Sequence, residues 1–233
     1  MRLPAQEEKA RTVREMFDRI APGYDRMNVL MTGGLDRVWR RRLMREVGLG
    51  AGDRVVDLGC GTGDLIELAT EAGAQAVGID PAGGMLAVAR DRGMGALVVQ
   101  GDALAIPLAD QSVDIVTTAF ALRNVLSIPP VFQESSRILR PGGRIAILEV
   151  SQPAFGPARA VHTFYFQKVV PLVGQLLADR EAYRYLPASV AYLPEPAALI
   201  SMLEENGFGQ VRRISLGAGA VQLLVGTRLG GSL

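Results

Sequence analysis

Cysteine and histidine are almost absent from this sequence. Its 233 residues include one cysteine, Cys60, and one histidine, His162. A single cysteine excludes an internal disulfide and a zinc site built from cysteines, and it fits a reducing compartment. A single histidine argues against a His-rich metal site. We therefore expect no bound metal ion.

Long apolar runs, a leader segment and an excess of charge are missing as well. No apolar run reaches the roughly 18 residues that span a membrane. Residues 1–18 are charged and lack the apolar core of a signal peptide. The 25 basic and 24 acidic residues leave a net charge of +1, so nucleic acid is not expected as a partner. We expect a soluble, cytoplasmic protein, and the sequence leaves open whether it touches a membrane surface or forms a homodimer.

The composition is ordinary for a soluble α/β protein, with 48% hydrophobic and 21% charged residues. The length indicates one domain, residues 1–233. From residue 53 onward, candidate strands and helices alternate, which predicts a parallel sheet covered by helices on both faces. The predicted strands are 54–58, 76–80, 96–100, 113–120 and 144–150, and the predicted helices between them are 64–72, 84–92 and 131–139.

An N-terminal helical arm, residues 1–50, precedes the first strand. Its first helix has apolar residues at i, i+3, i+4 and i+7, and Pro22-Gly23 ends it. Its second helix has an apolar face and an arginine face. We interpret the arginine face as solvated, with attraction to an anionic membrane surface as the less favoured alternative. The first apolar face is Val13, Met16, Phe17 and Ile20, the second is Trp39, Leu43 and Val47, and the arginines are Arg37, Arg41 and Arg45.

Two segments follow the core, which we place at residues 51–152. Residues 153–194 are long, apolar and aromatic, and we interpret them as a helical cap inserted over the ligand-binding edge of the sheet. Such a cap adds to the core and also makes a pocket for an apolar substrate. Residues 195–233 predict a helix that begins at Pro196, followed by two close strands, 211–216 and 220–227.

The chain is organised around an Asp-x-Gly-x-Gly-x-Gly segment between the first strand and the next helix. A phosphate-binding P-loop would end in Lys-Ser/Thr, which is absent, and a dinucleotide loop would have a third glycine where Asp64 stands. The segment resembles the loop of class I S-adenosylmethionine (SAM)-dependent methyltransferases. A glycine-rich turn without a ligand is the alternative. The residues that would approach the amino-acid part of SAM are Gly59, Gly61, Thr62 and Gly63.

Acidic residues stand at the ends of three successive predicted strands. Asp57 would act electrostatically on the SAM ammonium group, and Asp80 would accept both ribose hydroxyls. Asp102 would accept from the adenine amino group, and the backbone N–H of Ala103 would serve a ring nitrogen. Any one of them alone is more simply a cap or turn residue. Together with the glycine loop they predict a SAM site, because ligands of open α/β sheets bind at the carboxyl ends of strands.

The fourth predicted strand runs into Phe120-Ala121-Leu122-Arg123-Asn124-Val125. An arginine between apolar residues at a strand end is costly to bury without a role. Arg123 is therefore either a functional residue or half of a structural ion pair with Glu149, and the spacing favours neither.

Several segments resemble the ubiquinone/menaquinone biosynthesis C-methyltransferases. Residues 24–28, Tyr-Asp-Arg-Met-Asn, with Gly34 and Trp39, are similar to one signature of this family, and residues 137–151 are similar to the second. Residues 120–125 resemble its Phe-Gly-Leu-Arg-Asn-Val, and 183–189 resemble a further block. Departures from the pattern are Thr32 for Ser, Asp36 where many members have His, Ala121 for Gly, and Arg140 for Lys.

The resemblance implies a class I methyltransferase with a Rossmann-like fold, in which a mostly parallel seven-stranded sheet has an antiparallel last strand. It adds Ala119 to the cofactor positions Thr62, Asp80, Asp102 and Ala103. It implies C-methylation of a polyprenylated quinol ring, as in the conversion of demethylmenaquinol to menaquinol. Methylation of another small apolar acceptor, and a SAM-binding scaffold without catalysis, are the alternatives.

C-methylation needs an electron-rich ring, which follows from loss of a phenolic proton. We assign Arg123 to stabilising the developing phenolate, and Asn124 and Tyr24 to holding the hydroxyl. The residues assigned to substrate binding are Phe120, Tyr165 and Tyr183.

Overall fold

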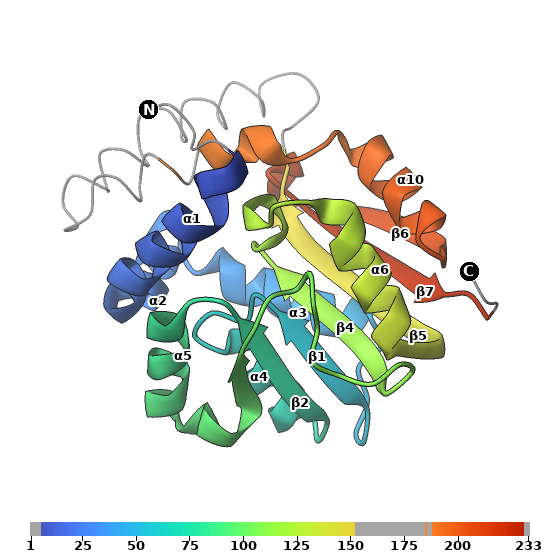
Figure 1. Ribbon diagram of the computed structural model, residues 1–233, viewed down its shortest axis with the longest axis horizontal. Coiled ribbons are helices and arrows are strands. Elements are labelled where there is room, and N and C mark those ends of the chain that lie inside the picture. Colours follow the sequence, from blue (N-terminus) through green and yellow to red (C-terminus); the bar gives the residue numbers. More distant parts are fainter. Residues whose placement is uncertain (1–5, 152–184, 186–187, 231–233) are drawn as a thin grey trace.

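A computed structural model describes residues 6–151, 185 and 188–230. A single seven-stranded sheet forms its centre, in the order β3-β2-β1-β4-β5-β7-β6 (Figure 1). The first five strands are mutually parallel, and β7 is antiparallel to both of its neighbours. The predicted fold class is confirmed, including the antiparallel last strand. The strands are β1 Arg54–Leu58, β2 Gln75–Asp80, β3 Val98–Gln100, β4 Val113–Ala119, β5 Leu139–Val150, β6 Phe208–Leu216 and β7 Val221–Arg228.

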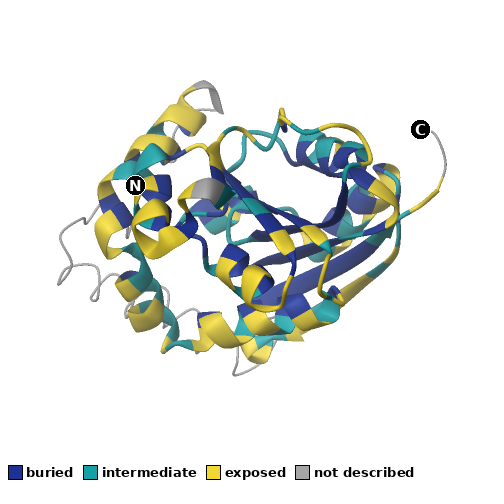
Figure 2. Ribbon diagram, turned by 90° about the horizontal axis from the view of Figure 1, so that it is seen from below, coloured by how far each residue is buried: buried dark blue, intermediate teal, exposed yellow. Residues whose placement is uncertain are grey.

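Helices cover both faces of the sheet, so the central strands are buried on both sides (Figure 2). Alternating side chains point to opposite faces. On β5, Ala146 and Leu148 belong to one core cluster, whereas Ile145 and Ile147 belong to the other. The first cluster lies under α3 Leu35–Glu46, α4 Asp64–Glu71 and α5 Gly83–Ala89, and the second lies under α6 Ile128–Ile138 and α10 Pro196–Glu205.

The N-terminal arm begins over the carboxyl-terminal edge of the sheet, beside α5 (Figure 1), and its last helix, α3, packs on one face of the sheet. It consists of α1 Gln6–Ile20, a short 3-10 turn Ala21–Gly23, α2 Tyr24–Thr32, and α3. A third apolar cluster joins the arm to α5, with Met16, Met27 and Met85 among its buried members. The helix α2 has no counterpart among the predicted helices, although Tyr24, Met27 and Met31, at i, i+3 and i+7, pack into this cluster.

Several element boundaries differ from the sequence prediction. The helix α6 begins at Ile128, three residues early, because two prolines are tolerated in a first helical turn. The strand β5 begins at Leu139 and includes the Pro-Gly-Gly turn, where Gly142 has a φ of +77°. The strand β6 begins at Phe208, three residues early, whereas β7, Val221–Arg228, is shifted by one residue and keeps its predicted length.

The predicted cap falls almost wholly outside the described residues, and with it Tyr165, Tyr183 and His162. Within the described ranges, no helix is long and apolar enough to cross a membrane.

Candidate active site

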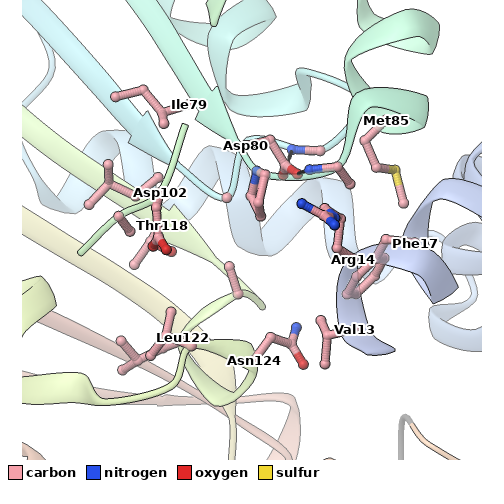
Figure 3. Close-up of a pocket in the computed structure, with 18 of the residues that line it drawn as sticks. Val13, Arg14, Phe17, Ile79, Asp80, Met85, Asp102, Thr118, Leu122 and Asn124 are labelled. Atoms are coloured by element: carbon pink, nitrogen blue, oxygen red, sulfur yellow. Dashed lines mark hydrogen bonds between the residues drawn. The ribbon is translucent and has the colours of Figure 1, made fainter. Parts of the chain in front are cut away.

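A cavity opens at the carboxyl ends of β1, β2 and β4, and α1 forms its opposite wall (Figure 3). Its empty volume is about 980 Å³, part of which is open to solvent. Asp80 and Asp102 lie on the strand side, and Arg14 and Phe17 face them from α1 (Figure 3). The predicted site residues that line this cavity are Tyr24, Gly59, Gly61, Asp80, Asp102, Ala103, Ala119, Phe120 and Asn124.

The glycine loop uses its own amides inside the protein. Gly59 N–H donates to the Ile79 carbonyl at 2.8 Å, and Gly63 N–H donates to the Cys60 carbonyl at 3.0 Å. Gly61 N–H donates to Asp80 Oδ2 at 2.9 Å. At these three positions the loop therefore offers a ligand carbonyl oxygens and close backbone approach rather than N–H donors. Carbonyl oxygens suit the ammonium group of an amino acid better than its carboxylate.

Asp80 ends β2 and is 7% exposed. Its Oδ1 accepts from Ala82 N–H at 2.8 Å, while Oδ2 accepts from Gly61. Each carboxylate oxygen has two lone pairs, so both oxygens keep one for a further donor, as a ribose diol requires. Burial raises the pKa of Asp80 to about 6, and the two amide hydrogen bonds oppose that rise.

The far end of the cavity is formed by the loop after β3. Asp102 is exposed, and its Oδ1 accepts from Leu104 N–H at 3.0 Å. Ala103 and Leu104 line the cavity beside it, and Ile79 adds an apolar side chain from β2. The carboxylate can accept a hydrogen bond from the amino group at the edge of a purine, and the apolar side chains can pack against the faces of its ring.

Thr62 lies behind the loop rather than in the cavity. Its hydroxyl donates to Asp25 Oδ1 on α2 at 2.6 Å, and its carbonyl accepts from Arg92 at 3.0 Å. Arg92 also pairs with Asp64 at 2.9 Å. Thr62 thus fastens the N-terminal arm to the glycine loop. Gly63 is close-packed, since an added Cβ would lie 2.6 Å from the sulfur of Met94.

Asp57 lies beneath the glycine loop and does not line the cavity. It is 3% exposed and accepts a hydrogen bond from the Thr117 hydroxyl at 2.8 Å. Burial raises its pKa to about 7, which the hydrogen bond from Thr117 and the charge of Arg40 partly offset. An effect of Asp57 on a ligand would therefore be exerted through space.

Phe120 shapes the cavity at the end of β4. Its φ of +59° is in the left-handed region, which is rare for an aromatic residue and marks strain of the kind found at ligand sites. The ring packs edge-on against Trp39 at 6.4 Å, and the Arg40 guanidinium lies 5.4 Å from its centroid. Arg40 itself is 6% exposed and pairs with Asp36 at 3.1 Å.

Ala121 and Gly59 are in tight contact at the centre of the site. A Cβ added to Gly59 would lie 2.4 Å from the Ala121 Cβ. Both residues line the cavity. The methyl group of Ala121 therefore leaves no room for a side chain at position 59.

Asn124 projects into the cavity and is held there by Tyr185, which is not among the predicted site residues. The Tyr185 hydroxyl donates to Asn124 Oδ1 at 3.1 Å. Tyr185 is 1% exposed, and burial raises its pKa to about 12, so it remains a donor at neutral pH. Its only signal in the sequence was membership of the family-like block 183–189. Tyr24 enters the cavity from α2 and packs edge-on against Phe17 at 6.0 Å.

Arg123 forms the ion pair that the sequence left as one of two alternatives. Its Nη1 donates to Glu149 Oε1 at 2.5 Å and to the Phe120 carbonyl at 2.7 Å, and its Nε donates to Ser189 at 3.2 Å. Arg123 does not line the first cavity. It lines a second one, which shares Leu122, Val125 and Leu126 with the first.

The model of the ubiE/COQ5 methyltransferase family matches residues 4–228. The chain belongs to this family. The demethylmenaquinone methyltransferase of Roseiflexus sp. (strain RS-1) is 42% identical over 98% of both chains. The one from Thermus thermophilus is 42% identical over 91% of this chain and all of the relative. The C-methyltransferase UbiE of Syntrophotalea carbinolica is 39% identical, with 92% and 93% covered.

Solved structures with a similar fold include other methyltransferases. A SAM-dependent methyltransferase from Aquifex aeolicus has a TM-score of 0.62 at 18% identity, covering 88% of this chain and 98% of that one. A phosphoethanolamine N-methyltransferase from Haemonchus contortus, in complex with S-adenosylhomocysteine, has a TM-score of 0.60 at 16% identity, covering 82% and 52%.

This ubiE/COQ5 family member is a SAM-dependent methyltransferase, and its cavity fits that cofactor. Carbonyl oxygens of the loop, the two lone pairs of Asp80 and the apolar slot beside Asp102 match an ammonium, a diol and a purine in that order along the strand ends.

Proposed function

We propose that this enzyme methylates a ring carbon of a polyprenylated quinol, and that demethylmenaquinol is its acceptor. The observation that carries this proposal is the 42% identity to demethylmenaquinone methyltransferases over nearly the whole chain. The cavity supports this proposal. The part of it around the Asn124 amide is apolar and aromatic and is lined by Phe17, Tyr24 and Phe120. An aromatic ring with one polar substituent fits such a surface.

Bound SAM supplies the methyl group. The protein contributes position and electrostatics. We infer that Asn124, fixed by Tyr185, and Tyr24 hold the hydroxyl of the acceptor ring. We infer further that Arg123 adds positive charge behind the Phe120 carbonyl, although Glu149 neutralises much of it.

The test is an anaerobic assay with SAM and demethylmenaquinol. The expected result is a product heavier by one CH₂ unit, with the new methyl group on the ring by fragmentation. A prenylated benzoquinol lacking the ring methyl group is the second arm, and a catechol is a non-quinol control. Methylation of the catechol without methylation of either quinol would overturn the proposal.

We also propose that the α2–α3 face contacts an anionic membrane surface, where a polyprenylated acceptor resides. Six large apolar side chains are exposed in the described residues, and four of them lie on these two helices. Exposed arginines flank them, so the face has both the apolar and the cationic character that anionic bilayers bind. The apolar residues are Val29, Leu30, Leu35 and Val38, and the arginines are Arg26, Arg37, Arg41 and Arg45.

Sedimentation with vesicles tests this contact. Binding to phosphatidylglycerol vesicles should exceed binding to phosphatidylcholine and should be lost in Leu30→Glu/Val38→Glu. Val99→Glu is the control, because Val99 is 45% exposed and lies on β3, outside these two helices. The alternative partner of this face is a second copy of the chain. In that case the double substitution would leave vesicle binding unchanged and would halve the mass measured by ultracentrifugation.

A further inference from the structure

Lysine is almost unused in this chain, and one of its lysines is buried. Of the 25 basic residues, 23 are arginine, and the lysines are Lys9 and Lys168. Arginine therefore supplies almost all of the positive charge of the chain. Lys9 lies on α1 and is only 4% exposed, whereas Lys168 lies outside the described residues. A buried amine is costly unless an interaction compensates for the lost water.

The Lys9 amine faces a carbonyl and an aromatic ring. Its Nζ donates to the Val125 carbonyl at 2.6 Å and lies 3.8 Å from the centroid of the Tyr192 ring. Both contacts favour the charged form, because the carbonyl needs a donor and the ring face attracts a cation. No carboxylate among the described residues pairs with it, so its charge is not neutralised within that part of the chain.

Lys9 lies where the two cavities meet. It lines the second cavity together with Arg123. Its neighbours on α1, Ala10 and Val13, line the cofactor cavity, and Val125 lines both. A ring that rests against Asn124 and extends past Val125 would thus bring an oxygen substituent toward the Lys9 amine.

We propose that the Lys9 ammonium group binds the ring oxygen of the acceptor and stabilises it as a phenolate. This inference rests on the proposed function, since it needs an aromatic acceptor with an ionisable hydroxyl. In this step the ring O–H bond breaks, the oxygen keeps the electron pair, and the proton goes to water. The ammonium group keeps all its protons. A phenol ordinarily ionises near pH 10, and a positive charge in a desolvated cavity lowers that value.

The groups around Lys9 leave it as the one that titrates near neutral pH in this part of the described structure. Burial lowers the pKa of Lys9 to about 8. Arg123 is paired with Glu149. Burial raises the pKa of Tyr192, and it raises that of Tyr185 to about 12, so both phenols remain neutral. The charged form of Lys9 should therefore be lost as the pH rises through about 8.

Nuclear magnetic resonance can follow Lys9 directly, because the chain has two lysines. Protein labelled with ¹³C,¹⁵N-lysine gives two side-chain signals, and Lys168→Arg identifies them. With S-adenosylhomocysteine bound, we expect the Lys9 Cε shift to titrate with a midpoint near pH 8. Adding 1-naphthol should raise that midpoint, because a phenolate stabilises the ammonium. A midpoint near the ordinary value for lysine, about 10.4, that does not respond to 1-naphthol would overturn the inference.

Kinetics give the second readout, with SAM saturating and demethylmenaquinol as acceptor. Lys9→Met should lower kcat/KM by about 10²-fold, as removal of an oxyanion donor does, and leave the SAM affinity unchanged. Wild-type kcat/KM should fall above about pH 8, and Lys9→Arg, which stays charged, should lose that fall. Arg11→Met is the matched control, since Arg11 lies on the exposed face of the same helix.

The outcomes separate the role of Lys9 from the methylation of quinols. Lys9→Met with wild-type kcat/KM and pH profile ends the role of Lys9 while quinol methylation stands. A wild-type enzyme that ignores quinols ends the proposed function, and the 1-naphthol titration then still decides whether Lys9 binds a phenolate. If Lys9→Met fails to fold, the titration and Lys9→Arg decide.

Discussion

Lowering the pH should release the cofactor through Asp80. Its carboxylate has to be ionised to accept two ribose hydroxyls, and burial raises its pKa to about 6. At pH 5 about one tenth of the ligand-free protein carries the ionised form. The Kd for S-adenosylhomocysteine should therefore be about tenfold weaker at pH 5 than at pH 7. Calorimetry between pH 5 and 7 measures this, below the range where the ligand's own amino group titrates.

The stability of the ligand-free protein should move the opposite way. The folded pKa of Asp80 lies above its ordinary value of 3.8, so the folded protein binds more protons than the unfolded chain between pH 4 and 6. This contribution to the free energy of unfolding grows as the pH falls through about 6. Asp57, with its pKa raised to about 7, acts in the same direction. Acidification should thus raise the Tm of the ligand-free protein while it weakens binding.

Two variants assign the effect. Asp80→Ala should weaken binding by about 1.5–3 kcal/mol, or about 10- to 150-fold, and remove the pH dependence near 6. Asp102→Asn, at an exposed carboxylate, should keep that dependence. A constant Kd from pH 5 to 7 in the wild type would refute the ribose role of Asp80. A pH dependence of Kd that persists in Asp80→Ala would instead be assigned to Asp57.

Three further predictions follow from contacts in and near the cavity. Arg123→Ala leaves Glu149 buried without its partner, so urea denaturation should show a loss of about 3–5 kcal/mol, and a loss below 1 kcal/mol would contradict the buried pair. Gly59→Ala should abolish SAM binding, and Ala121→Gly in the same chain should restore part of it, because the two Cβ atoms would lie 2.4 Å apart; no rescue would mean that the left-handed φ of Gly59 dominates. Acceptor affinity should rise with prenyl length by about 0.8 kcal/mol per buried CH₂, and equal affinity for a tail-less quinol would show that the segment 153–194 does not hold the tail.

The sheet could be predicted because each strand is bounded by strong local signals. The β1 range was predicted without error, and Asp57, Asp80 and Asp102 mark three strand ends in the right order. Parallel strands bring their carboxyl ends to one edge, so residues far apart in sequence were placed together correctly. The helix α2 was not predicted, because its 9 residues contain only three positions of an apolar stripe, Tyr24, Met27 and Met31.

The roles within the site were harder to predict, because they depend on which atoms are already bonded. The sequence cannot show that the amides of Gly59, Gly61 and Gly63 are used internally, or that Thr62 faces α2. Tyr185 contacts Asn124 across 61 positions, and no local pattern encodes such a pair. Asp57 was predicted to act electrostatically on the SAM ammonium group, and the sequence cannot show that its side chain accepts from Thr117 beneath the loop.

The buried ion pair of Asp36 and Arg40 limits which substitutions this chain can accept at these positions. The family pattern that residues 24–39 resemble has histidine in many members where this chain has Asp36. Here Asp36 accepts from the Thr32 hydroxyl at 2.9 Å and neutralises Arg40, which lies against the Phe120 ring. Histidine in place of Asp36 would remove the carboxylate that pairs with Arg40. It would put an imidazole ring, neutral or positively charged, beside the Arg40 guanidinium instead. The residue that is common in the family would thus be unfavourable in this background, and the effect of any change at position 36 depends on what stands at positions 32 and 40.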